Sequence, residues 1–236
     1  MGTFQKHSSG PNGFRWNDAD AYLFDIDGTL LTTRDGVHRA AIHQAMREVY
    51  GVNTTIDGIA YHGKTDLGIL RAALEGAGVS GAVFEERLSA ALEVVRREVD
   101  ANASHITPEI CPAIPNVLHH LQTEGKLLGI ATGNLQSVGW HKIGAAGLRD
   151  FFEFGSFSDH RETRAEVFVE ARAEVRQRLG NAATVCFVGD TLADIRAARH
   201  VGAHIIAVST GIYKFDELLS HTPDLCVASC AELLAT

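Results

Sequence analysis

Two aspartates one residue apart, Asp25 and Asp27, follow an apolar run and precede Gly28. If the run is a strand that continues through them, both side chains lie on one face, because strand side chains alternate. Adjacent carboxylates repel each other, and a hard cation such as Mg²⁺ is a common reason to place them together. Gly28 permits a sharp turn with N–H groups free to bind an anion. An acidic turn is the alternative.

A hydroxyl residue follows a second apolar run. Residues 127–131 lead into Thr132, Gly133 and Asn134, and a helical pattern comes next. A hydroxyl and free amides at a helix N-terminus suit a phosphate oxygen, so these three residues are candidate phosphate ligands. Thr132 or Asn134 acting only as a helix N-cap is the alternative.

A third apolar run, residues 185–188, ends in Gly-Asp. The carboxyl ends of parallel strands lie along one edge of a sheet, so we expect Asp190 to meet Asp25 and Asp27 there as a metal ligand. Asp194 follows one helical turn later. It either orients a metal-bound group from a second layer or only stabilises the first turn of its helix.

These motifs, in this order, resemble those of the haloacid dehalogenase superfamily, in its phosphatase branch with a helical cap (phosphoglycolate phosphatase-like and β-phosphoglucomutase-like proteins). The resemblance spans about residues 20–212. It implies that Asp25 is the nucleophile and Asp27 the general acid and base. It also implies Mg²⁺ bound by Asp25, Asp190 and the Asp27 carbonyl, with Gly28 near the phosphate. Dehalogenases of the superfamily lack a counterpart of Asp27, which favours a phosphatase.

The basic residue of the family pattern departs from the usual form. The resemblance calls for a lysine roughly 25 to 35 residues before the Gly-Asp motif, but no lysine lies between Lys142 and Lys214. Arg164 precedes Asp190 by 26 residues, and a guanidinium binds phosphate and carboxylate well. We therefore expect Arg164 to supply the charge. Arg161 is the competitor, and a solvated charge at a helix start is the other alternative.

Strand and helix patterns alternate along the chain except in one all-helical block. Strands are predicted near 20–26, 127–131, 151–154, 184–188, 204–208 and 225–227, and helices near 36–50, 65–77, 81–104, 114–124, 136–146, 163–179 and 192–201. Alternation predicts an α/β fold, a Rossmann-like parallel sheet with helices on both faces. The predicted organisation is a flexible leader (1–18), a catalytic core (19–32 and 111–236) and a helical cap (33–110).

The predicted cap contains Lys64, between two predicted helices. In proteins that this chain resembles, a cap loop at this place helps to select the substrate, which makes Lys64 a candidate anion contact.

Composition limits the partners. The formal net charge is −8, which argues against nucleic acid or an anionic membrane as the main partner. The four cysteines and twelve histidines show no metal-binding spacing. No signal peptide or membrane span of ~18 apolar residues is evident. We therefore expect a cytoplasmic protein, monomeric or homodimeric, that acts on a small molecule.

The sequence thus predicts a Mg²⁺-dependent phosphatase that hydrolyses a small phosphate monoester through an aspartyl-phosphate intermediate. A phosphoglycolate-like or sugar phosphate ester is the substrate class that the family suggests. A sugar phosphomutase is the nearest alternative, because it would share every motif. A phospho-acceptor signalling domain needs only about half this length, and a non-catalytic binding module is disfavoured by the intact acidic set.

Overall fold

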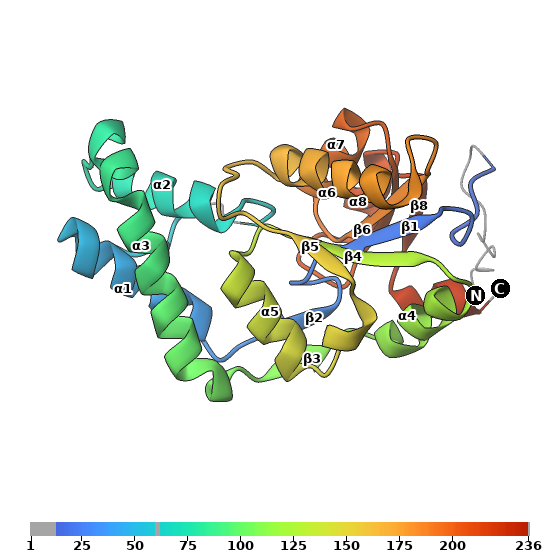
Figure 1. The fold of residues 1–236 in the computed structure, drawn as a ribbon, viewed down its shortest axis with the longest axis horizontal. Coiled ribbons are helices and arrows are strands. Elements are labelled where there is room, and N and C mark those ends of the chain that lie inside the picture. Colours follow the sequence, from blue (N-terminus) through green and yellow to red (C-terminus); the bar gives the residue numbers. More distant parts are fainter. Residues whose placement is uncertain (1–12, 60–61, 236) are drawn as a thin grey trace.

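A six-stranded parallel sheet forms the centre of the computed structural model, which describes residues 13–59 and 62–235 (Figure 1). The strand order is β5-β4-β1-β6-β7-β8, and every neighbouring pair is parallel. The strands are β1 (Ala21–Phe24), β4 (Leu127–Ala131), β5 (Phe154–Ser156), β6 (Val185–Gly189), β7 (His204–Val208) and β8 (Leu225–Val227). This is the predicted α/β class.

Helices cover both faces of the sheet. One face packs against α4 (Ile114–Thr123), α5 (Gln136–Ala145) and the 3₁₀ segment Cys230–Leu234. The other packs against α6 (Arg164–Leu179), α7 (Leu192–His200) and α8 (Phe215–Ser220). Figure 1 shows the two helical layers on opposite sides of the strands.

Three helices, α1 (Val37–Tyr50), α2 (Asp66–Gly76) and α3 (Gly81–Asn102), form a separate cluster of buried residues, here called the helical part. It lies beyond one end of the sheet in Figure 1. An antiparallel pair, β2 (Leu31–Thr33) with β3 (Pro108–Ile110), runs between the helical part and the sheet. The predicted boundaries at 32/33 and 110/111 fall within or next to these two strands.

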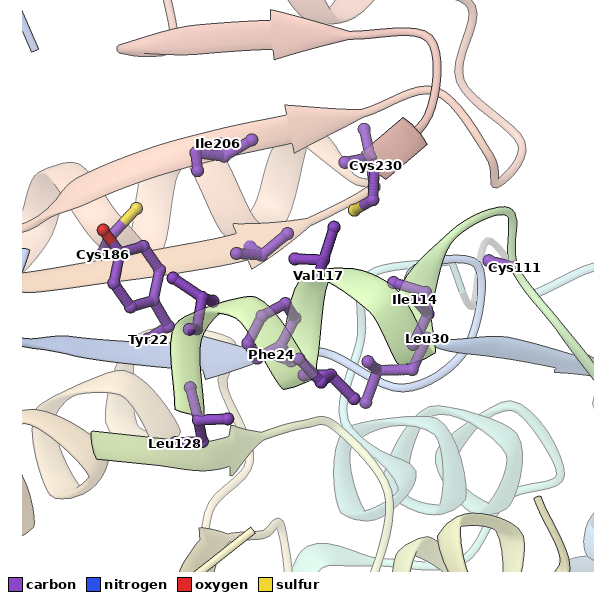
Figure 2. Packing of buried hydrophobic residues seen from close by; sticks show 14 of the residues in the cluster. Tyr22, Phe24, Leu30, Cys111, Ile114, Val117, Leu128, Cys186, Ile206 and Cys230 are labelled. Carbon is purple, nitrogen blue, oxygen red and sulfur yellow. The ribbon is translucent and has the colours of Figure 1, made fainter. Parts of the chain in front are cut away.

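The strands carry apolar side chains on both faces, because successive residues point to opposite sides of the sheet and helices cover each side. Tyr22 and Phe24 of β1 pack on the α4 side, where Figure 2 shows Phe24 beside Val117 and Tyr22 beside Cys186. Ala21 and Leu23 belong to the cluster on the opposite face. A strand between two helical layers has no solvent face, so it carries no alternating polar residues. The four cysteines are all free, and Cys226 is the one that is not fully buried.

Several elements differ from the prediction. The strand β1 ends at Phe24, two residues before the predicted end. The strand predicted near 151–154 lies at 154–156, because Arg149–Phe151 forms a 3₁₀ turn. The pair β2 and β3 and the helix α8 were not predicted, since they have only three to six residues and show little periodicity.

The predicted flexible leader, 1–18, falls mostly on residues 1–12, which lie outside the described residues. Its remaining part differs from the prediction. Phe14 and Trp16 are buried in the same cluster as β1 and α4, so residues 13–18 are not a flexible segment. The many Gly and Ser residues of the predicted leader favoured a flexible segment, and the anchoring role of these two aromatic residues was not recognised. Among the described helices, none has the length and apolar content needed to cross a membrane.

Replacing Phe187 with alanine tests the packing on the α6 side of the sheet. Its ring stacks on Phe168 with centroids 3.8 Å apart and both side chains are buried. The cavity should lower the apparent free energy of unfolding by about 3–5 kcal/mol, measured by urea denaturation. Val169→Ala is the control, because Val169 is 51% exposed and should change stability by less than about 0.5 kcal/mol. Equal effects of the two substitutions would contradict this packing.

Candidate active site

A cleft of about 660 Å³ lies at the carboxyl edge of the sheet, facing the helical part. Eight predicted site residues line it: Asp25, Asp27, Gly28, Lys64, Gly133, Asn134, Arg164 and Asp190. They come from four loops and one helix start, separated by up to 165 residues in sequence. The parallel strands β1, β4 and β6 bring three of these loops together because their carboxyl ends share one edge, and the loop with Lys64 comes from the helical part. Thr132 and Asp194 are buried behind the cleft and do not line it.

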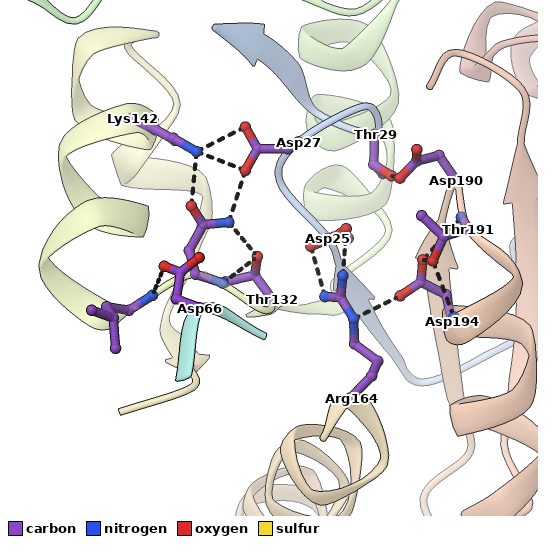
Figure 3. A network of polar contacts seen from close by, with 12 residues as sticks. Asp25, Asp27, Thr29, Asp66, Thr132, Lys142, Arg164, Asp190, Thr191 and Asp194 are labelled. Atoms are coloured by element: carbon purple, nitrogen blue, oxygen red, sulfur yellow. Dashed lines mark hydrogen bonds and ion pairs between the residues drawn. The ribbon is translucent and has the colours of Figure 1, made fainter. Parts of the chain in front are cut away.

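Three buried aspartates form an acidic group, and two of them, Asp25 and Asp190, line the cleft. Asp25, Asp190 and Asp194 are 4%, 3% and 0% exposed, and one oxygen of each lies within 4.8 Å of the others. Arg164 is the cation beside them: its Nη1 lies 2.9 Å from Asp25 Oδ1 and its Nε lies 3.3 Å from Asp194 Oδ1 (Figure 3). Three carboxylates against one guanidinium leave two uncompensated negative charges.

Burial and repulsion from neighbouring carboxylates disfavour the charged forms of Asp25 and Asp190. Burial raises the pKa of Asp25, although Arg164 acts in the opposite direction. Burial also raises the pKa of Asp190 well above its usual range, and the charges of Asp25 and Asp194 add to this effect. A divalent cation would remove the excess charge, and an all-oxygen donor set is the one that Mg²⁺ prefers. The residues present therefore fit a magnesium ion.

Backbone geometry at Gly28 fixes the position of Asp190. Gly28 has a φ of 82°, and a Cβ there would lie 2.4 Å from Asp190 Oδ2. The hydroxyl of Thr29 donates a hydrogen bond to Asp190 Oδ1 over 3.3 Å. A residue with a side chain at position 28 would be strained and would displace the carboxylate. Glycine is thus required here for close approach as well as for the turn.

Asp27 does not lie beside Asp25 as the strand argument predicted. Because β1 ends at Phe24, both aspartates lie in the following loop and their carboxylates have different partners (Figure 3). The two oxygens of Asp27 lie 2.8 and 2.7 Å from Lys142 Nζ, and Asn134 Nδ2 donates over 2.8 Å. Asp27 is absent from the acidic group. A metal contact through its backbone carbonyl remains a prediction.

The pKa of Asp27 moves in the opposite direction from those of Asp25 and Asp190. Burial raises it, but the charge of Lys142 and the hydrogen bonds from Lys142 and Asn134 outweigh burial and hold the pKa below its usual value. The two aspartates of the first motif are therefore placed in different electrostatic surroundings. Such a difference is typical of a pair of carboxylates that perform different chemical tasks.

The Thr132-Gly133-Asn134 turn, which follows β4, contacts the helical part. The Thr132 hydroxyl accepts hydrogen bonds from Asn134 N and Nδ2 at 3.3 and 3.0 Å. The Gly133 carbonyl accepts from Asp66 N at 2.7 Å. A Cβ on Gly133 would lie 2.5 Å from the carbonyl oxygen of Lys64. Part of the sequence signal at this turn thus reflects packing, since only glycine allows the 64–65 loop to approach so closely.

Of the two candidate arginines, Arg164 contacts Asp25 and Arg161 does not. Arg164 is the first residue of α6, and Thr163 caps this helix in a capping box with Glu166. The cap fixes the direction of the first turn, and the Arg164 side chain, 7% exposed, points into the acidic group. Arg161 instead forms an ion pair with Glu170 over 3.3 Å, away from the cleft.

Sequence analysis missed Lys142, which enters the site from α5, 115 residues from Asp27. One signal was available. Lys142 shares the buried face of its helix with Val138 and Ile143, and a lysine on an apolar face requires a partner. The partner cannot be identified from sequence, because nothing local links α5 to the loop after β1.

Comparison with known proteins identifies the family of the chain. The sequence model of the haloacid dehalogenase-like hydrolases matches residues 19–202, more than three quarters of the chain. The chain belongs to this hydrolase family. The "Probable phosphatase IndB" of Dickeya dadantii (strain 3937) is 28% identical over 90% of each chain. A phosphoglycolate phosphatase of Rhodobacter capsulatus is 23% identical, with 83% of this chain and 87% of that protein covered.

Solved structures support the same fold. CbbY from Rhodobacter sphaeroides, in complex with phosphate, superposes with a TM-score of 0.67 at 18% identity and covers 91% of this chain and 96% of its own. A hydrolase from Pseudomonas syringae has a TM-score of 0.63 at 19% identity, with the same two coverages. At these identities the likeness establishes the α/β fold with its helical part.

Thermal unfolding tests the metal site without an activity assay. Mg²⁺ should raise the melting temperature of the metal-free protein, because a ligand of the native state at a hundred times its dissociation constant adds about 2.7 kcal/mol. Asp190→Asn should melt no lower than the metal-free parent, since a repelled charge is removed, and should lose the response to Mg²⁺. Asp150→Asn is the control and should keep it. An unchanged response in Asp190→Asn would contradict this site.

Proposed function

We propose that this hydrolase is a Mg²⁺-dependent phosphatase that cleaves small phosphate monoesters through an aspartyl-phosphate on Asp25. The observation that carries the proposal is Asp25 itself, a cleft-lining carboxylate held by Arg164 within a buried acidic group that fits a divalent cation. Relatives named as phosphatases support the reaction class.

In the first half-reaction Asp25 attacks the phosphorus atom and the ester P–O bond breaks. The leaving oxygen takes a proton from the carboxylic acid form of Asp27 and departs as an alcohol, which leaves Asp27 as a carboxylate. The bound phosphate dianion favours that acid form, because negative charge beside a carboxyl group raises its pKa. Phosphate then remains on Asp25 as an acyl phosphate.

In the second half-reaction water attacks the acyl phosphate. Asp27 accepts the water proton, the phosphorus–Asp25 bond breaks, and its electron pair returns to the Asp25 carboxylate. Inorganic phosphate leaves and Asp27 is again an acid for the next turnover. The lowered pKa of Asp27 beside Lys142 favours the carboxylate, the form that this half-reaction needs.

Charge stabilisation accompanies both steps. Asp25, Asp190 and the Asp27 carbonyl would hold Mg²⁺, which when bound offsets the repulsion between carboxylate and phosphate. The guanidinium of Arg164 stays ionised because Asp194 and Asp25 raise its pKa against the effect of burial. Positioning and charge stabilisation supply most of the rate in phosphoryl transfer. Asp194 accepts from Thr191 and pairs with Arg164, so its role is to orient Arg164.

The cleft suits a small substrate. About 660 Å³ accommodates a compact phosphate ester. We propose that Gly28, Thr132, Gly133 and Asn134 form the phosphate end of the site, Thr132 through its contact with Asp25. Lys64 lines the other wall and is exposed. We propose that the helical part acts as the cap and that Lys64 contacts the leaving group.

A panel of phosphate esters assayed with Mg²⁺ tests the function. Release of inorganic phosphate from at least one small ester, lost with chelator and restored by Mg²⁺, is the expected result. Asp25→Asn should lower turnover by at least about 10⁴-fold, because no acyl phosphate can form. Conversion between sugar phosphate isomers without phosphate release would identify a phosphomutase. Undiminished turnover in Asp25→Asn would contradict the mechanism.

Arginine substitutions test the cation of the site. Arg164→Ala should lower kcat/KM by about 10²–10³-fold, because Asp25 and the phosphoryl group lose their fixed positive charge. Arg164→Lys should recover only part, since one ammonium cannot reproduce a two-pronged contact. Arg161→Ala is the matched control and should change kcat/KM by less than about threefold. The reverse order of the two alanine variants would show that the cation has been misassigned.

A further inference from the structure

Lys142 is a buried lysine whose ammonium has an unusually complete set of partners. Its side chain is 4% exposed. The Nζ atom lies 2.8 and 2.7 Å from the two oxygens of Asp27, 2.8 Å from Asn134 Oδ1 and 3.3 Å from His38 Nδ1. Removing an ammonium from water is costly unless such partners replace it. A buried ammonium with these partners therefore has a structural or a catalytic role.

We propose that Lys142 is a positioning residue that fixes the Asp27 carboxylate for proton transfer. This inference rests on the acid–base role of Asp27 in the proposed function. Both side chains line the cleft, but Asp27 is 42% exposed and Lys142 only 4%. The substrate therefore meets Asp27, and Lys142 acts through that carboxylate.

The contact geometry favours positioning over a nonspecific charge effect. Lys142 contacts both oxygens of Asp27, and Asn134 Nδ2 holds one of them over 2.8 Å. Lys142 in turn donates to Asn134 Oδ1, so the three side chains form a closed ring of hydrogen bonds (Figure 3). Such a ring fixes both the rotamer and the plane of the carboxylate. If Lys142 is removed, Asn134 is the one described side chain that still donates a hydrogen bond to the Asp27 carboxylate.

Separate cations also keep the two aspartates apart. Arg164 pairs with Asp25 and Asp194, and Lys142 pairs with Asp27. A carboxylate without its own cation is attracted to a divalent ion only two residues along the chain. By neutralising the charge of Asp27, Lys142 keeps the Asp27 side chain directed at the leaving oxygen instead of at the metal site.

The ring extends into the helical part. Lys142 Nζ lies 3.3 Å from His38 Nδ1, and the other ring nitrogen of His38, Nε2, lies 2.9 Å from Asp66 Oδ2. Asp66 also accepts from Leu135 N over 2.8 Å. His38 belongs to α1 and Asp66 to α2, while Lys142 and Leu135 lie at α5. The position of the Lys142 ammonium therefore depends on both parts of the molecule.

Leaving-group dependence tests the proposal with Lys142→Met, which keeps the length of the side chain without its charge. Loss of a positioned acid should lower kcat/KM for an alkyl phosphate such as 2-phosphoglycolate by about 10²-fold or more. For p-nitrophenyl phosphate, whose leaving group needs no proton, kcat/KM should fall by less than about fivefold. A merely structural role would lower both equally, and that result would overturn the proposal. Lys126→Met is the control and should match the parent protein on both esters.

A double-mutant comparison keeps the test valid if the unpaired Asp27 in Lys142→Met impairs folding. Asp27→Asn removes the carboxylate, so adding Lys142→Met should change kcat/KM for p-nitrophenyl phosphate by less than about threefold. A further loss of tenfold or more would overturn the proposal, because Lys142 would then act on something other than Asp27. Alkyl phosphate turnover that survives in Asp27→Asn would refute the proposed acid instead. An inactive Asp27→Asn together with a fully active Lys142→Met would refute only this inference.

Discussion

Negative charge gathered at one sheet edge is the constraint on which the rest of the site depends. Asp25, Asp190 and Asp194 are nearly inaccessible to water, and the guanidinium of Arg164 pairs with two of them, Asp25 and Asp194. Burying such a group is costly unless a cation compensates its charge. The surrounding backbone is adapted to it, since Gly28 leaves room for the Asp190 carboxylate and its turn directs Asp27 elsewhere.

The second constraint follows from the proposed mechanism, in which two aspartates only two residues apart perform different chemistry. The structure separates them by ending β1 early and by giving each its own cation, Arg164 from α6 and Lys142 from α5. Both cations come from helices on opposite faces of the sheet. The parallel sheet is therefore more than a scaffold, because it is what allows two helical layers to reach one loop from different sides.

The sheet, the order of the motifs and the position of Arg164 beside Asp25 could be predicted from the sequence, because each rests on a local pattern next to a strand end. It failed where the decisive contact is long-range. The strand argument placed Asp27 beside Asp25, and only the observed end of β1 at Phe24 corrects it. Lys142 and the anchoring residues Phe14 and Trp16 were missed because their partners lie far away in sequence.

Trapping the covalent intermediate tests the central claim most directly. The enzyme is mixed with Mg²⁺ and p-nitrophenyl phosphate, quenched in acid during the first turnover, and treated with borohydride, which reduces an acyl phosphate on aspartate to homoserine. The account predicts homoserine at position 25, found by peptide mass spectrometry, with more of it in Asp27→Asn because the second half-reaction lacks its base. Reduction at another residue, or none at all while phosphate is still released, would contradict the account.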